Sequence, residues 1–261
     1  MRNIVLLTAG CSWTKSIGVG YEHGMSKEDS LDKNGIFWNY EVCDNLSFRG
    51  ILSKKYGINN INLSRGGASN QQQFRLLEQF LASSQYTKLV DTGTKIIVLH
   101  GITSTARNEV YLNSKGKMEN FMFNFREKNL QEIDFMIKYF YDHDNEVERL
   151  TDKMNFMNRF YQAAGIDNLW FDTFNHHNYS NAIDNLIEPN VAYRDLLSTM
   201  AAEIGLVDMD NSYHKSLWKV DSNRVQWLMD KGLLNPFTYH PTKQGHEMIA
   251  NIIDPYLEKI I

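Results

Sequence analysis

The sequence predicts an α/β fold in which helices cover both faces of a central parallel sheet, forming a three-layer α/β/α sandwich. Short apolar runs of strand length alternate with longer segments whose apolar residues recur at helical intervals. Three of these runs lead directly into turns rich in glycine and hydroxyl residues, which is typical of the ligand-binding edge of a parallel sheet. The length of 261 residues and the hydrophobic content of 43% suit one large core. We therefore expect a single domain over residues 1–261, with an insertion or lid around 111–165.

The first predicted strand begins at Ile4 with the apolar run Ile-Val-Leu-Leu and is closed by Gly10. The turn that follows delivers Ser12. Ligands of open α/β sheets bind outside the carboxyl ends of the strands, so Ser12 is a candidate nucleophile at the edge of that crevice. The same turn also fits an ordinary strand-to-helix connection, with Ser12 or Thr14 as the helix N-cap. Residues 15–34 lack apolar periodicity and are expected to form a long surface loop near the site.

The second predicted strand, 58–63, is preceded by a helix over 37–56 that ends at Gly57, a natural C-cap. Beyond the strand, Gly66 and Gly67 would let backbone N–H groups approach a ligand closely. A plain turn before a capped helix explains the same residues, so both interpretations stay open at this point.

A helix over 71–84 and a third buried strand over 95–100 come next. Residues 111–128 are irregular and contain alternating phenylalanines, which favours a hairpin-like or lid-like insertion. Two helices are expected over 130–162, divided near 142–145, because the apolar period changes there. Their methionine and aromatic stripes are typical of core packing.

The fourth predicted strand is 169–174, followed by His176 and His177, which we interpret as a loop pair. A metal site at these histidines would need an acidic or cysteine ligand at suitable spacing, and none is evident. We therefore predict no metal. A helix over 191–204 and a short last strand follow, the strand opening at 206–207 and ending at Asp208 or Asp210.

Near the end of the chain, a helix over 224–231 precedes a segment in which His240 stands directly before Pro241. Thr242 is suited to cap the terminal helix, expected over 247–260. A histidine in this place is held at a helix entrance with its side chain able to point toward a site.

The composition limits the partners and the location. The formal net charge of −4 lacks the basic excess that nucleic-acid binding needs, so no nucleic-acid partner is expected. No apolar run reaches the ~20 residues of a membrane span, and the first apolar stretch is too short for a signal peptide. We expect a cytoplasmic protein without a membrane partner or cofactor. Cys11 and Cys43 are expected to be reduced.

Four turns, taken in this order, resemble the motifs of the SGNH (GDSL-type) hydrolase superfamily, and the resemblance spans nearly the whole chain. The triplet ending in Ser12 occupies the first family block, which implies that Ser12 is the nucleophile. Asn62 and the glycines that follow it resemble the second block, which implies that the N–H of Gly67 contributes to the oxyanion hole.

The third family block corresponds to Gly101 and the residues after it, and it places Thr103 where the family asparagine completes the oxyanion hole. In the last block, His240 and Pro241 match the family pattern, which implies that His240 is the general base. His246 lies inside the helix that the family packs behind the site, so it is expected to be structural.

Two further positions depart from the family. Cys11 replaces an aspartate in the first block, and Phe237 stands where the last block carries the acid that orients the histidine. His240 would then be oriented by a main-chain carbonyl, by Thr238, or by Asp208 or Asp210. A wrong histidine tautomer costs ~10⁴ in rate, and loss of an oxyanion donor ~10²–10³, so some activity remains reasonable.

The resemblance implies a serine esterase or acyl hydrolase acting on a small acyl ester or a carbohydrate O-acetyl group, with acyl transfer to an alcohol as a variant. A catalytically impaired domain that binds a glycan or a protein partner is the alternative. A nucleotide or phosphate binder is weaker, since the glycine spacing of the known phosphate loops is missing. Arg107 is a candidate for holding an anionic substrate group; a solvated charge or an ion pair explains it as well.

Overall fold

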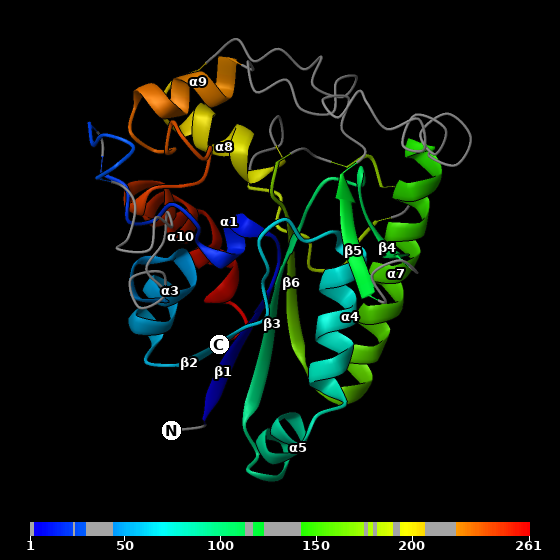
Figure 1. The fold of residues 1–261 in the computed structure, drawn as a ribbon. Coiled ribbons are helices and arrows are strands. Elements are labelled where there is room, and N and C mark those ends of the chain that lie inside the picture. The colour runs from blue at the N-terminus through cyan, green and yellow to red at the C-terminus, as the bar shows by residue number, and fades with distance from the viewer. Residues whose placement is uncertain are drawn as a thin grey trace.

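The computed structural model describes residues 3–22, 24–29, 44–112, 117–122, 142–174, 177–179, 182–189, 194–206 and 223–261. Its centre is a parallel sheet of four strands in the order β2-β1-β3-β6 (Figure 1). The strands are β1 (Ile4–Ala9), β2 (Asn59–Asn62), β3 (Lys95–Ile102) and β6 (Asp167–Asp172). The predicted α/β class, with a parallel sheet and helices on both sides, is confirmed.

The strand order determines which edge of the sheet can hold a ligand. The first strand pairs with β2 on one side and with β3 on the other, both in parallel register. The chain therefore adds strands first on one side of β1 and then on the other, which places the topological switch point between β1 and β3. In open α/β sheets the crevice at this point, outside the carboxyl ends of the strands, is the usual binding site.

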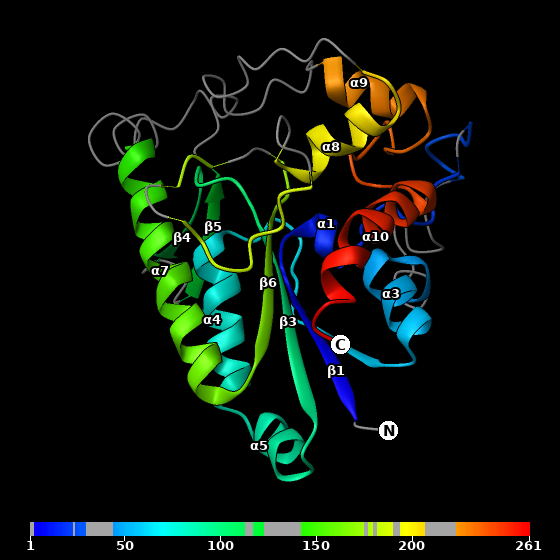
Figure 2. The same cartoon turned by 180° about the vertical axis from the view of Figure 1, so that it is seen from behind.

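Alternate residues of the strands face two separate cores. Leu6 and Leu99 pack against α3 (Phe48–Tyr56), α8 (Leu196–Glu203), α9 (Asn223–Asp230) and α10 (Lys243–Leu257). Leu7 and Val98 pack on the opposite face against α4 (Asn70–Leu81) and α7 (His143–Ala164). The two views in Figures 1 and 2 show these helix groups on opposite sides of the sheet. Burial of both faces explains the continuous apolar runs in β1 and β3, whereas β2, at the edge of the sheet, is mostly polar.

Side-chain caps fix where the helices begin. Each capping oxygen accepts a hydrogen bond from the backbone N–H three residues later, which satisfies a donor that the helix leaves unpaired. The caps of this kind are Ser47, Ser69, Ser83, Asp142, Asp195 and Thr242.

Several expected elements differ in extent. A helix that was not predicted, α5 (Ser84–Asp91), fills the connection before β3 because Ser83 caps it. The predicted division near 142–145 is the start of α7, and the expected helix before it lies outside the described residues. The last predicted strand is wrong at Leu206, which is not in a strand, and its remaining residues are not among those described.

The expected insertion begins with a hairpin. Strands β4 (Arg107–Leu112) and β5 (Lys117–Met122) pair antiparallel, apart from the main sheet. Residues 123–141, which include two of the three alternating phenylalanines, lie outside the described part of the chain. Within the part that is described, no helix combines the length and the apolar character needed to cross a membrane.

Candidate functional site

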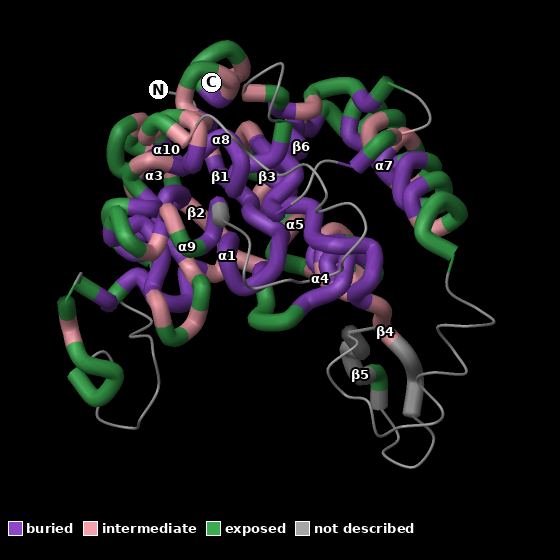
Figure 3. The backbone as a smooth tube through the Cα atoms, turned by 90° about the horizontal axis from the view of Figure 1, so that it is seen from above, coloured by how far each residue is buried: buried purple, intermediate pink, exposed green. Residues whose placement is uncertain are grey.

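The turn after β1 presents Ser12 as the first residue of the short helix α1 (Ser12–Lys15). Seen from above in Figure 3, this helix is buried near the middle of the molecule. A Cβ at Gly10 would lie 2.0 Å from Oγ1 of Thr14, so the turn closes tightly only with glycine at this position. The Ser12 side chain retains 6% exposure, and its hydroxyl has no hydrogen-bond partner among the described residues. The predicted N-cap role falls instead to Cys11, whose side chain makes no capping bond.

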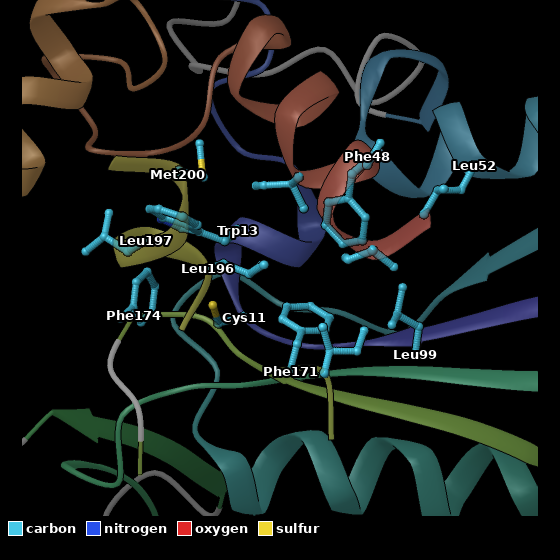
Figure 4. Close-up of a cluster of buried hydrophobic side chains, with 14 of the residues drawn as sticks. Cys11, Trp13, Phe48, Leu52, Leu99, Phe171, Phe174, Leu196, Leu197 and Met200 are labelled. Carbon is cyan, nitrogen blue, oxygen red and sulfur yellow. The ribbon is translucent and has the colours of Figure 1, made fainter. Parts of the chain in front are cut away.

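Cys11 and Trp13 anchor this turn in the apolar core. Figure 4 shows both side chains in the cluster that packs α8 against the sheet. The Trp13 ring meets Phe174 edge-on, with the ring centroids 5.0 Å apart. An ionised carboxylate at the Cys11 position would be buried in apolar surroundings, which is costly without a partner. The departure from the family aspartate therefore agrees with the local packing.

Arg49 of α3 stabilises the turn that carries Ser12. The side chain is fully buried, and its Nε donates a 3.3 Å hydrogen bond to the carbonyl oxygen of Thr14. The guanidinium also donates to Asn60 Oδ1 at 2.9 Å and pairs with Asp44 at 2.6 Å. Arg49 is a positioning residue that the sequence pattern did not reveal, since an arginine in a helix is usually exposed.

The segment carrying His240 lies against the Ser12 turn. The Trp13 indole N–H donates a 3.2 Å hydrogen bond to the carbonyl oxygen of Tyr239, and a Cβ added at Gly18 would lie 3.0 Å from the His240 Cβ. Tyr239 has a left-handed backbone with φ of 59°, an uncommon and strained conformation for a non-glycine residue. The N–H of Asn235 holds the His240 carbonyl at 2.8 Å. Residues 226 positions apart in sequence thus meet at the switch point.

The His240 ring is neutral near pH 7. Its pKa is lowered to about 4, mainly by burial; the Thr238 main chain acts in the opposite direction, and the charge of Arg107 adds to the lowering. Within the described structure, Nδ1 of the ring is buried without a hydrogen bond of ordinary geometry, and Ser12 and His240 are not hydrogen-bonded to each other. Phe237 stands at the position of the family acid but has no carboxyl group. Its side chain is 39% exposed and packs edge-on against the ring of Tyr21.

Thr238, Asp208 and Asp210 are the side chains expected to orient the His240 ring. The hydroxyl of Thr238 is buried and has no partner among the described residues. Asp208 and Asp210 lie outside the described part of the chain. No described side chain makes a hydrogen bond of ordinary geometry to Nδ1 of His240, so the group that orients the ring stays a prediction.

The predicted oxyanion donors lie on neighbouring turns. Gly67 is exposed with φ of 70°, and no described residue accepts a hydrogen bond from its N–H. The turn is joined to the Ser12 loop by a 3.1 Å hydrogen bond from Arg65 N–H to the Gly10 carbonyl. Thr103, by contrast, is fully covered, with its hydroxyl buried and without a partner among the described residues. Because that hydroxyl is buried, a ligand cannot reach it in this conformation. Its role in the oxyanion hole stays a prediction.

Thr103 is fixed by Asn70, the first residue of α4. The Asn70 side chain accepts a hydrogen bond from the Thr103 N–H and donates one to the Thr103 carbonyl, both at 2.9 Å. This pairing satisfies both backbone groups of a buried residue at the end of β3. The preceding residue, Ser69, is the N-cap of this helix.

Arg107 lies at the same edge and is 94% buried, with 6% exposure. Its guanidinium carbon sits 5.3 Å from the centroid of the Phe174 ring, a cation–π arrangement. The side chain also lines a cavity of about 340 Å³ between α4 and α7. Arg107 is therefore an interior cation between the His240 segment and a cavity, whereas Glu109 forms a separate ion pair with Arg75.

A buried carboxylate–imidazole pair at the end of β6 was not predicted. His177 Nδ1 lies 2.9 Å from Asp172 Oδ1, and the Tyr179 hydroxyl donates to the same oxygen at 2.6 Å. Nε2 of His177 is buried and has no partner among the described residues. His177 lies in the loop after β6, as predicted, but its ring is held by Asp172, five residues earlier in the chain. His176 lies outside the described residues.

The described residues contain no group of three or more histidine, cysteine, aspartate or glutamate side chains able to hold a metal ion. Comparison with models of known protein families, and with curated proteins, finds no match. The resemblance to the SGNH superfamily therefore stays a prediction from the four sequence motifs.

Proposed function

We propose that the protein is an SGNH-like serine hydrolase that cleaves an ester or acyl group through an acyl-enzyme on Ser12, with His240 as the general base. The observation that carries the proposal is the hydrogen bond from Trp13, next to Ser12, to Tyr239, next to His240. Two residue types that nucleophilic catalysis needs are thus held on touching segments, at the edge where α/β sheets bind ligands.

The proposed chemistry uses a neutral imidazole. The hydroxyl oxygen of Ser12 attacks the carbonyl carbon while His240 takes the hydroxyl proton, and negative charge develops on the carbonyl oxygen. The N–H groups of Ser12 and Gly67 are the donors for that oxyanion, since the first N–H of a helix has no intrahelical acceptor. The ester C–O bond then breaks, and His240 returns the proton to the leaving alcohol. Water, activated by the same imidazole, releases the acid and restores Ser12.

The substrate class follows from the resemblance, with small acyl esters and carbohydrate O-acetyl groups as the proposed substrates. Transfer of the acyl group to an alcohol differs only in the second nucleophile. We further propose a cytoplasmic location and no nucleic-acid partner. These proposals are consistent with the net charge of −4.

One observation favours a second candidate, a domain that keeps the pocket and binds a glycan or protein without catalysis. No described carboxylate contacts His240, whereas catalytic histidines are normally oriented by an acid. The Asp172–His177 pair carries that carboxylate instead, so His177 is the rival base if catalysis occurs with a different geometry.

The test is hydrolysis of p-nitrophenyl acetate by wild type and four variants. We expect Ser12→Ala to abolish enzymatic turnover and His240→Gln to lower kcat by about 10²–10⁴, the usual contribution of a general base. Ser84→Ala, a serine change on the distant α5, and His177→Gln serve as controls and should retain turnover. Loss of activity in His177→Gln but not in His240→Gln would assign the base to His177. Absence of turnover in a folded wild-type protein would support the binding domain.

A further inference from the structure

A polar groove lies beside the amino end of β6. Its walls are the carboxyl half of α7, the first residues of β6 and the turn at Asp184 and Asn185, and its volume is about 600 Å³. Figures 1 and 2 show the carboxyl end of α7 and the helix α1, which carries Ser12, toward opposite ends of the sheet. We call this the amide groove, because five side-chain amides line it: Asn155, Asn158, Gln162, Asn168 and Asn185.

Hydrogen bonds hold the inner amides of the groove in place. Oδ1 of Asn158 accepts from the indole N–H of Trp170 at 2.7 Å and from Nδ2 of Asn168 at 2.8 Å. Nδ2 of Asn158 donates to the carbonyl oxygen of Asp184 at 3.2 Å, which ties α7 to the turn. The carbonyl oxygen of Asn185 accepts a 3.0 Å hydrogen bond from the Trp170 N–H. The groove is therefore preorganised, which lowers the entropic cost of binding a ligand there.

The edge of β6 presents unpaired main-chain groups at the same place. The N–H and the carbonyl oxygen of Trp170 bond to Asn185 and Ile187, outside the sheet. Alternate residues of a strand direct these groups to the same side, so those of Asn168 point this way too. Neither group of Asn168 has a hydrogen-bond partner among the described residues, although Asn168 is only 5% exposed. Buried polar groups without partners are rare, and a ligand that both donates and accepts hydrogen bonds would satisfy these two.

The outer side chains of the groove are also open. Asn155, Arg159 and Gln162 follow one another at intervals of three or four residues along one face of α7. None of these side chains, nor the Asp184 carboxylate on the opposite wall, has a partner among the described residues. Asp167 is already engaged in an ion pair with a lysine of β3 at 3.0 Å. The open charges are one guanidinium and one carboxylate, so the groove has no net charge to offer a ligand.

We propose that the amide groove is a binding site for a neutral saccharide, whose hydroxyl groups bond to the side-chain amides and to the main chain of Asn168. A hydroxyl both donates and accepts hydrogen bonds, and a side-chain amide has the same two capacities. Ile166 is the one hydrophobic side chain in the described lining, so a lipid or an aromatic ligand would find little apolar surface. A volume of about 600 Å³ is in the usual range for small-ligand sites.

The site goes beyond the hydrolase function proposed above and does not depend on it. The groove lies at the amino end of β6, whereas Ser12 follows the carboxyl end of β1 in the same parallel sheet. A saccharide in the groove would therefore attach the protein to a carbohydrate without occupying the proposed catalytic centre.

The experiment is a titration of ¹⁵N-labelled protein, followed by NMR of its side-chain amide signals, which report on the groove itself. The probes are neutral trisaccharides: maltotriose, cellotriose, mannotriose and triacetylchitotriose. We expect at least one of them to shift the signals of Asn155 and Gln162. The signals are assigned by their loss in Asn155→Ala and Gln162→Ala.

The same two variants test the contacts. Both remove amides without a described hydrogen bond and introduce the best helix former, so both should fold. Each should weaken binding of the trisaccharide by about 3-fold to 10-fold, the usual effect of losing one neutral hydrogen bond. The matched control is Asn251→Ala, which removes an exposed amide from α10 on the other face of the sheet and should leave the affinity unchanged. Thermal unfolding verifies that each variant is folded.

Two further probes extend the test to other ligands. Trigalacturonate carries carboxylates, and acetyl-trialanine amide offers a peptide backbone. Tighter binding of trigalacturonate than of every neutral trisaccharide, weakened in Arg159→Gln, would assign the groove to anions and overturn the proposal. Binding of the peptide alone would overturn it as well. So would the absence of any shift with the neutral trisaccharides at about 10 mM, where even a ligand of millimolar Kd is mostly bound. A shift that Asn155→Ala and Gln162→Ala leave unchanged would place the saccharide elsewhere.

Discussion

The most informative prediction concerns the pH at which activity is lost in acid. Burial lowers the pKa of His240 from 6.5 to about 4, and the charge of Arg107 contributes in the same direction. This difference between the two pKa values corresponds to about 3 kcal/mol between the two protonation states. At pH 5.5 about 97% of a base with pKa 4 is neutral, against about 9% of one with pKa 6.5. A proton-accepting His240 should therefore still work at pH 5.5.

The assay is kcat/KM for p-nitrophenyl acetate from pH 3.5 to 8 at constant ionic strength, because kcat/KM reports the pKa of the free enzyme. We expect a plateau down to about pH 5 and a fall through about pH 4. Circular dichroism at each pH, and a return to pH 7 before a second assay, separate titration of the base from unfolding.

Arg107→Met tests the cause of the shift. Removing the positive charge should raise the pKa of His240 and move the acid limb to higher pH, while leaving part of the shift because burial is its larger cause. Arg159→Met, which removes a cation from α7 near the amino end of β6, should leave the acid limb in place. An acid limb near pH 6.5 in wild type, or one that Arg107→Met does not move, would refute the reasoning.

Three further predictions concern stability and can be read by denaturant unfolding. Gly10→Ala should cost about 1–3 kcal/mol because the new Cβ meets Thr14, whereas Gly20→Ala, with open space around it, should be tolerated; equal effects would contradict the turn packing. Asn70→Ala should cost about 2–5 kcal/mol by leaving both backbone groups of Thr103 unpaired, and a cost below about 1 kcal/mol would contradict this. Burial lowers the pKa of three histidines in the folded protein, His100, His240 and His246. The unfolded state therefore binds more protons, and stability that is present above pH 6.5 is lost as the pH falls. Each histidine contributes about 1.4 kcal/mol per pH unit between about 6.5 and its folded pKa. Burial raises the pKa of Asp195 to about 6, which acts in the opposite direction between about pH 6 and 4. The net loss of stability near pH 5 should be about 3 kcal/mol per pH unit. Stability independent of pH from 7 to 5 would overturn this prediction.

The strands were predictable because burial on both faces leaves an unbroken apolar run. Three of the four strands, β1, β3 and β6, show this pattern, and the turn after β1 carries Ser12. The role of His246 was also foreseen, since it is fully buried in α10 and stacks on Phe48. Local pattern and helix-capping chemistry contain this information directly.

The missed residues depend on contacts between distant parts of the chain. Nothing in the neighbours of Arg49 shows that its guanidinium reaches the carbonyl of Thr14, 35 residues away. One sequence feature could have predicted the Asp172–His177 pair. An acid stands at the carboxyl end of a buried strand, and a histidine follows five residues later. The covered position of Thr103 could not be foreseen, because it follows from the pairing with Asn70.

The central claim is that Ser12 is a nucleophile activated by His240. The most direct measurement is the reaction of the folded protein with a fluorophosphonate, followed by mass-spectrometric mapping of the modified peptide. We expect the phosphonyl group to be found on Ser12, and we expect labelling to slow strongly in His240→Gln. Labelling at another residue, or no labelling of a protein that remains folded, would contradict it.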